Sequence, residues 1–268
     1  MITQFVEWSL PAFTLALFCA QFAAEEIGLR IGRSRRARNK GIGGGGIGVV
    51  VGGLLGLLAF VLALTLSFAS GRFTERLNGT LREANAIGTA WLRAEAIDDP
   101  RGKEIAGLLE QYLRVRIEFV KAAPEPAVLT RLSARTNELQ SKIWGDVTAI
   151  VRARPGPVAV SLQEGVNDAF DMTTAERFAY TLRMPPEIIW LLLGLALLSM
   201  GALGYQLGFI TRPVRIMTLL LNAAWTLIIV DILDLEAPRV GGFRTSTAAY
   251  EWTLQSFQSG TPTPPPSQ

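Results

Sequence analysis

Residues 41–71 read GIGGGGIGVVVGGLLGLLAFVLALTLSFASG, a run without a charged side chain whose densest apolar part is 47–69. A helix needs about 20 mainly apolar residues to cross the roughly 30 Å hydrocarbon core of a membrane. This run is long enough to do so, and we therefore predict a transmembrane helix here.

Three further segments, 5–24, 188–209 and 214–233, have the same apolar character. Taken alone, each is also compatible with a buried helix of a soluble protein. Four such segments in a chain of 268 residues, of which 18% are charged, make that alternative a poor one. We predict an all-α integral membrane protein with four transmembrane helices. The N-terminus lacks the basic region of a cleavable signal peptide.

The region between the second and third predicted spans reads as helices that end at prolines. The second span is expected to continue as one long helix through 72–97. Apolar residues then recur at helical spacing in 105–113 and 128–150, without an alternating run long enough for a sheet. The expected parts are 5–71 with two spans and a basic loop, 72–186 as a helical extramembrane region, 187–235 with two more spans, and 236–268 as a C-terminal segment with a disordered Pro-rich tail.

Basic side chains are concentrated in two of the connections between spans. The first connection holds Arg30, Arg33, Arg35, Arg36, Arg38 and Lys40, and the last holds Arg212 and Arg215. The positive-inside rule places such loops in the cytoplasm, so that both termini and 72–186 face outward. Acidic and basic residues are nearly balanced in 72–183, and the net charge of +3 therefore does not indicate nucleic-acid binding.

The chain has no histidine and a single cysteine, Cys19. The usual general base, the commonest metal ligand and an internal disulfide are therefore absent from the sequence. Asp168 and Asp171 are a possible carboxylate pair, but at this helical spacing such residues more often cap a helix or pair with a cation such as Arg177. We predict neither enzymatic activity nor a cofactor.

Glycines of the second span recur every four residues, at Gly44, Gly48, Gly52 and Gly56. Repeated small residues allow transmembrane helices to approach one another closely. A flexible hinge before the helix begins is the alternative for the first few glycines. We expect close helix packing at Gly48, Gly52 and Gly56.

The same spacing continues with large apolar residues at Phe60, Leu64 and Phe68. If several copies of this helix surround an axis, these side chains form a dry constriction of the kind that gates channels by dewetting. A face packed against lipid or against the protein core is the commoner use of such a pattern. Periodicity alone does not separate the two.

Residues 62–76, LALTLSFASGRFTER, and 82–93, REANAIGTAWLR, resemble the bacterial bestrophin-like domain family, distant relatives of bestrophin channels. The resemblance extends over about 5–257. Its most specific part is 83–88, EANAIG. Further matches are Asn167, Asp171, Arg177 and the segment DILDLEAP at 231–238.

The resemblance implies a pentamer with four spans per subunit around one axial ion pathway. In bestrophins, three apolar neck residues on the second helix end eight residues before the arginine of a Tyr-Asp-Arg segment. Here Phe68 lies eight residues before Arg76, so the resemblance places the neck at Phe60, Leu64 and Phe68. The segment departs from the family in reading FTER at 73–76 and in lacking the tryptophans that follow.

In animal bestrophins, an acidic cluster after the fourth span helps to bind calcium. Asp231, Asp234 and Glu236 occupy the comparable place here. Calcium takes six to eight oxygen ligands, so three carboxylates are at most part of a site. A solvated helix end, or salt bridges to Arg239 or Arg244, is the alternative that we favour, and we predict no metal.

The resulting functional hypothesis is a homo-oligomeric, pentameric ion channel of the bacterial inner (plasma) membrane. Its expected partners are membrane lipid, other copies of the chain and inorganic ions, and no nucleic acid. Candidate residues of a vestibule beyond the neck are Glu75, Arg76, Glu83 and Asn85. The competing hypothesis is a non-conducting membrane scaffold or sensor whose helical insert binds a partner or a ligand. Bestrophins keep their termini and the second-to-third connection in the cytoplasm, whereas the basic loop predicts the opposite orientation.

Overall fold

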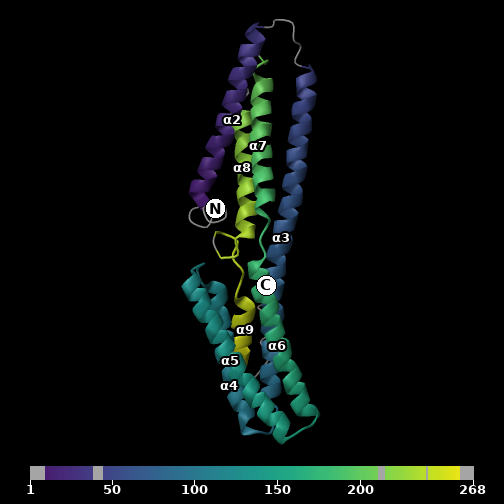
Figure 1. The fold of residues 1–268 in the computed structure, drawn as a ribbon, viewed down its shortest axis with the longest axis vertical. Coiled ribbons are helices and arrows are strands. Elements are labelled where there is room, and N and C mark those ends of the chain that lie inside the picture. The colour runs from purple at the N-terminus through teal and green to yellow at the C-terminus, as the bar shows by residue number, and fades with distance from the viewer. Residues whose placement is uncertain (1–9, 39–44, 211–214, 240, 260–268) are drawn as a thin grey trace. The chain divides into compact units, whose positions relative to one another are not determined.

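The computed structural model describes residues 10–38, 45–210, 215–239 and 241–259. Regular structure in these ranges is helical, without a strand. The chain forms two compact units, which Figure 1 shows as ribbons. Unit 1 comprises Met1–Arg72 and Arg183–Ala237, and unit 2 comprises Phe73–Leu182 and Pro238–Gln268. The predicted all-α architecture is confirmed.

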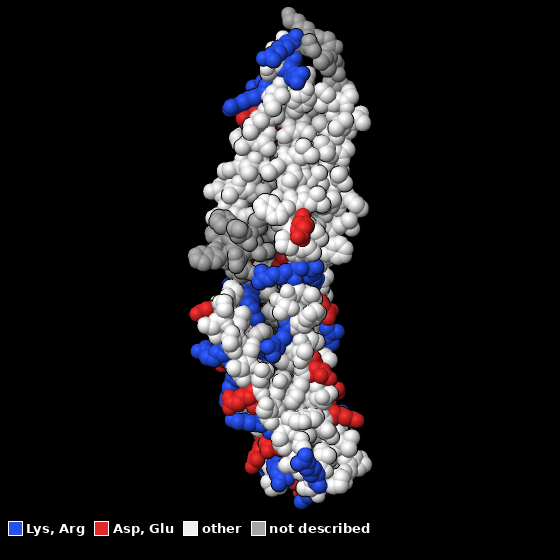
Figure 2. Space-filling view, in the orientation of Figure 1, with Lys and Arg blue, Asp and Glu red and all other residues white. Residues whose placement is uncertain are grey.

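Unit 1 contains the apolar helices. They are α2 (Leu10–Arg38), the first part of α3 (Gly45–Glu95), α7 (Pro186–Leu207) and α8 (Arg215–Glu236). Four helices of the described residues are long and apolar enough to cross a membrane, which confirms the predicted spans. The face of unit 1 in Figure 2 is mostly uncharged: basic side chains gather where α2 ends, and acidic side chains are seen only at isolated places.

Helices α2 and α7 pack tightly because glycines face backbone atoms of the partner helix. A Cβ atom at Gly28 of α2 would collide with the carbonyl oxygen of Gly201. A Cβ atom at Gly204 of α7 would collide with the carbonyl oxygen of Glu25. Only glycine fits such close contacts. This contact lies between α2 and α7, whereas glycine packing was predicted for the second span.

Unit 2 contains the rest of α3 together with four further helices. They are α4 (Pro100–Lys121), α5 (Pro126–Ala153), α6 (Pro157–Thr181) and α9 (Ala248–Ser259). Proline occupies the first turn of α4, α5 and α6, where its missing N–H costs no helical hydrogen bond. The side chain of Asp99 accepts a hydrogen bond from the N–H of Arg101 and thereby caps α4 (3.0 Å).

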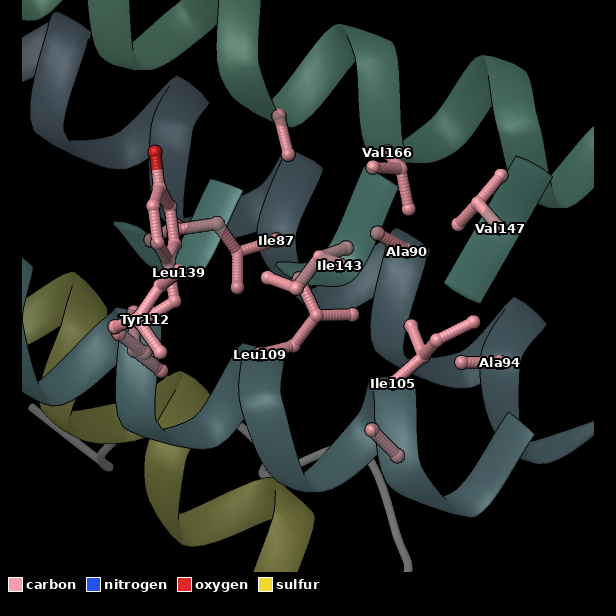
Figure 3. Packing of buried hydrophobic residues seen from close by; sticks show 14 of the residues in the cluster. Ile87, Ala90, Ala94, Ile105, Leu109, Tyr112, Leu139, Ile143, Val147 and Val166 are labelled. Carbon is pink, nitrogen blue, oxygen red and sulfur yellow. The ribbon is translucent and has the colours of Figure 1, made fainter. Parts of the chain in front are cut away.

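The core of unit 2 contains the apolar stripes of 105–113 and 128–150 that the sequence predicted, together with residues of α3, α6 and α9. Figure 3 shows side chains of α3, α4, α5 and α6 meeting between the helices. The labelled members are Ile87, Ala90, Ala94, Ile105, Leu109, Tyr112, Leu139, Ile143, Val147 and Val166. Burial of this apolar surface is the main favourable contribution to folding of the unit.

The C-terminal helix α9 belongs to unit 2. The ring of Phe257 stacks on that of Trp91 on α3, with 4.6 Å between ring centroids. Lys121 at the end of α4 donates a hydrogen bond to Glu251 (2.7 Å). The tail 260–268, which the sequence predicts to be disordered, lies outside the described residues, as do Lys40, Gly44 and Arg212.

Candidate functional site

The predicted neck residues form one exposed apolar face on α3. Phe60, Leu64 and Phe68 are 60%, 44% and 64% exposed, respectively. Leu58 and Leu62, on the other side of the same helix, are fully buried. We call the three exposed residues the neck face. Its side chains do not contribute to the interior of unit 1.

The neck face belongs to the least covered of the apolar helices. Only 17% of the most apolar 18-residue stretch of α3 is buried, whereas 33% and 39% of the corresponding stretches of α2 and α8 are buried. In the single chain, α3 therefore leaves most of its apolar surface uncovered. Lipid or another copy of the chain has to cover this surface in a membrane.

The predicted packing glycines do not contact another helix of the same chain, except at the first position. A Cβ atom at Gly48 would lie 3.1 Å from Nε2 of Gln206 on α7. A Cβ atom at Gly52 or at Gly56 would meet no atom within 4 Å. Close packing at Gly52 and Gly56 therefore stays a prediction.

The four predicted vestibule residues divide into two pairs. Glu75 and Asn85 are exposed, and Glu75 accepts a hydrogen bond from Arg82. In contrast, Arg76 and Glu83 are only 1% and 0% exposed and lie in the interior of unit 2. This position differs from the expectation that they line a vestibule. The reason is helical periodicity, because both residues lie on the side of α3 that faces the core.

Glu83 is the centre of a buried polar cluster that joins four helices. Its Oε1 accepts hydrogen bonds from Nε of Arg116 (2.6 Å) and from Oγ1 of Thr173 (2.6 Å). Its Oε2 accepts hydrogen bonds from Nη2 of Arg116 (3.2 Å) and from the hydroxyl of Tyr250 (2.5 Å). These partners come from α4, α6 and α9. Glu83, the first residue of the segment 83–88 that is most specific to the family resemblance, thus connects α3 to three other helices.

Burial shifts the pKa values of the tyrosines in this cluster. Tyr112 bonds to Thr173 (2.6 Å) and accepts a hydrogen bond from Gln140 (2.8 Å). Burial, and next the negative charge of Glu83, raise the pKa of Tyr112 to about 12. The same two causes raise the pKa of Tyr250 well above its ordinary value. Both hydroxyls therefore remain protonated donors at any physiological pH.

Glu176 on α6 is a second buried carboxylate near the cluster. Its Oε1 accepts a hydrogen bond from Oγ1 of Thr80 (3.0 Å), whereas its Oε2 has no hydrogen-bond partner among the described residues. Burial, and next the charge of Glu83, raise the pKa of Glu176 to about 7. Glu176 is not among the site residues predicted from the sequence. The sequence did contain an indication of its burial, because Glu176 recurs at helical spacing with Val166 and Ala169 on the buried side of α6.

The acidic residues at the end of α8 do not gather into a metal site. Oε2 of Glu236 accepts hydrogen bonds from Nη1 of Arg72 (2.8 Å) and from the backbone N–H of Met184 (2.9 Å). Asp234 is buried and Asp231 is exposed. The described part of the chain contains no group of three or more acidic, histidine or cysteine side chains that could hold a metal ion. Arg72 is thus the cationic partner that the sequence analysis missed.

Arg239 and Arg244, which the sequence suggested as salt-bridge partners of the acidic residues at the end of α8, make other contacts. The guanidinium of Arg239 lies over the rings of Phe119 and Tyr180, 4.5 and 4.7 Å from their centroids. Arg244 is exposed and donates to the carbonyl oxygen of Gly241.

The aspartates of α6 do not form a catalytic pair. Asp168 and Asp171 are both exposed, and Asp171 accepts a hydrogen bond from the amide of Asn167 (3.0 Å). The hydrogen bond from Asn167 is thus a contact within α6 at its surface.

No protein-family model matches the sequence, and neither does any curated protein. Among solved structures, two mutant forms of a bacterial bestrophin homologue from Klebsiella pneumoniae are similar. One has a TM-score of 0.67 at 15% identity and covers 91% of this chain and 98% of its own. The other has a TM-score of 0.68 at 14% identity and covers 94% and 97%, respectively. The chain is therefore an all-α membrane protein with a bestrophin-like fold.

Proposed function

We propose that the protein is a homo-oligomeric ion channel whose α3 helices line the pathway and whose neck face forms its constriction. The observation that carries this proposal is the exposure of Phe60, Leu64 and Phe68 on one face of the least covered apolar helix. The bestrophin-like fold supports it, because bestrophins are channels in which the second helix carries an apolar neck. Conduction involves no covalent chemistry, in keeping with a chain that has no histidine.

Bulky apolar side chains that meet around an axis exclude water from a narrow passage. An ion crosses such a neck only when the passage widens enough to become wet, which allows gating without a plug. Residues 45–71 of α3 are uncharged, so this stretch of the helix offers no ring of charges to select ions. Selectivity then depends on polar side chains beyond the neck. Among those expected from the sequence, Glu75 and Asn85 are exposed and retain this role in the proposal.

The proposal includes a pentamer, with Gly52 and Gly56 in contact with a neighbouring subunit. These glycines meet nothing in their own chain, and small residues are typical of helix contacts in lipid. Subunit contacts at these positions would cover part of the surface that α3 leaves open. Location in the bacterial inner (plasma) membrane, with the basic end of α2 in the cytoplasm, completes the proposal.

The experiment that tests conduction uses the purified full-length protein in planar lipid bilayers. We expect ion currents from the wild type and a higher conductance or leak from Phe68→Ala, because the neck is wider and wets more easily. Phe22→Ala is the matched control, since Phe22 is an exposed phenylalanine on α2. Silent bilayers from a folded oligomer, or equal effects of the two substitutions, would refute the proposal.

A non-conducting sensor remains the second candidate function. The observation that favours it is a cavity between α3 and α6 in unit 2, which offers space for a small ligand. Ligand binding without current in the same bilayers would distinguish a sensor from a channel.

A further inference from the structure

In unit 1, the C-terminal turns of α2 extend beyond the end of α7. The two helices run side by side as far as Gly32, where a Cβ atom would collide with the carbonyl oxygen of Tyr205 on α7. Helix α7 ends shortly afterwards, at Leu207, whereas α2 continues to Arg38. Residues 33–38 of α2 are therefore not covered by α7.

The end of α7 marks one boundary of the hydrocarbon core. At about 1.5 Å per residue, its 22 residues rise about 33 Å, which matches the roughly 30 Å of that core. At this end the rings of Tyr205 and Phe209 pack edge to face, and tyrosine is typical of the membrane–water interface. On α8, the exposed Ile216 directly follows the exposed Arg215. Residues 33–38 thus lie at the level of the lipid headgroups.

One side of α2 changes from apolar to basic at this boundary. Ile27 and Ile31 are 58% and 50% exposed, and Arg35 and Arg38 are exposed beyond them. On a helix with about 3.6 residues per turn, these four residues lie within about 80° of arc. We call them the boundary face of α2. It presents hydrocarbon to the membrane interior and two guanidinium groups to the headgroups.

The positive charge of this face is not balanced within the described part of unit 1. Arg30 pairs with Glu26 (3.4 Å), but none of the described acidic side chains forms an ion pair with Arg35 or Arg38. Figure 2 shows the basic side chains gathered where α2 ends. Guanidinium groups bind phosphate oxygens through several N–H donors at once. The face therefore complements a phosphate that is attached to a hydrocarbon chain.

We propose that the boundary face of α2 binds an anionic phospholipid. Its phosphate accepts hydrogen bonds from Arg35 and Arg38, and an acyl chain packs along Ile27 and Ile31. A soluble anion, such as an acidic peptide, would reach the arginines but not the isoleucines, which lie at the level of the hydrocarbon. A zwitterionic lipid carries a cation that repels the guanidinium groups. The proposal does not depend on whether the protein conducts ions.

The test measures lipid adducts of the full-length protein in detergent by native mass spectrometry. The probes are dioleoylphosphatidylglycerol, dioleoylphosphatidylcholine with the same acyl chains, and glycerol 3-phosphate, a phosphate without acyl chains. We expect the phosphatidylglycerol to bind at least tenfold more tightly than either of the others. Equal affinity of the two lipids would overturn the proposal, and so would glycerol 3-phosphate that binds as tightly as the lipid.

Variants locate the bound lipid. A basic residue near an anionic membrane contributes roughly fivefold in affinity, so Arg35→Gln together with Arg38→Gln should weaken phosphatidylglycerol binding about 30-fold. The matched control is Arg33→Gln together with Arg36→Gln, which removes the same charge from the other side of α2. We expect the control to weaken binding less than about threefold, since these arginines do not continue the apolar face.

Two outcomes of the variant experiment would overturn the proposal. Equal weakening by both pairs of substitutions would show that the end of α2 attracts lipid only through its total charge. Loss of the oligomer in the Arg35→Gln, Arg38→Gln variant, with the control still assembled, would assign the face to a neighbouring subunit. Neither readout requires current through the protein.

Discussion

Arg116 and Glu83 form a two-pronged ion pair in which neither side chain is exposed to solvent. Burial by itself would lower the pKa of Arg116, but the adjacent carboxylate of Glu83 raises it above its ordinary value instead. Arg116 thus stays charged inside unit 2. Thr173 and Tyr250 complete the coordination of Glu83, so that one carboxylate joins four helices.

Removal of one partner from this pair should destabilise unit 2 strongly. Glu83→Ala leaves the charge of Arg116 buried without its counterion, at a cost of about 3–5 kcal/mol. Glu138→Ala is the control, because Glu138 is exposed and pairs only with its surface neighbours Arg135 and Lys142. Thermal unfolding of the purified protein in detergent should show a lower Tm for Glu83→Ala alone. Equal Tm values for the two variants would contradict the assigned role of the pair.

The carboxylate of Glu176 should make stability depend on pH. Its pKa in the folded protein is about 7, above the ordinary value of 4.5, so the folded state binds this proton more tightly than the unfolded state. Stability from this group is therefore greatest at low pH and is lost as the pH rises from about 4.5 to about 7. The size of the effect is on the order of 3 kcal/mol.

Glu176→Gln imitates the protonated form and should remove this dependence. We expect the variant and the wild type to melt at similar temperatures at pH 5, and the variant to melt at the higher temperature at pH 8. The measurement is Tm at several pH values in the same detergent. A difference in Tm that stays constant from pH 5 to pH 8 would show that Glu176 does not titrate in this range.

Substitution of a glycine by a larger residue should affect the protein differently on α7 and on α3. Gly204→Ala forces a Cβ atom onto the backbone of α2, and we expect a loss of about 1–3 kcal/mol and a lower Tm. Gly56→Leu meets open space within its own chain, so the fold of the subunit should be retained. It should nevertheless reduce the oligomer fraction in native mass spectrometry. An intact oligomer in Gly56→Leu would exclude this glycine from the subunit contact.

Orientation in the membrane can be read from cysteine labelling. With Cys19 replaced by serine, a cysteine at Arg36 should react with a membrane-impermeant maleimide only in inside-out vesicles. A cysteine at Glu118 should react only in intact spheroplasts, because the positive-inside rule places α4 outside. The reverse pattern would assign the orientation of bestrophins to this chain and refute the prediction from the basic loop.

The sequence predicted the architecture well because the strongest signals were local. Long uncharged runs fix the four apolar helices, prolines mark where α4, α5 and α6 begin, and apolar stripes supply the core of unit 2. The spacing of Phe60, Leu64 and Phe68 likewise identified residues that share one exposed face.

Features that depend on distant partners could not be predicted in the same way. Arg76 and Glu83 look like ordinary surface charges in sequence, since the Arg116 that balances Glu83 lies on another helix. Arg72 is separated from Glu236 by 164 residues, so spacing gives no indication of that pair. Close contact of α2 and α7 depends on glycines in two separate spans, each unremarkable alone.

The most direct test of the proposed channel is a cryo-electron microscopy map of the full-length protein in lipid nanodiscs, viewed along its symmetry axis. The proposal predicts five subunits with the side chains of Phe60, Leu64 and Phe68 converging on the axis as the narrowest part of a continuous passage. A map in which these side chains face lipid, or in which no passage runs between the α3 helices, would contradict it.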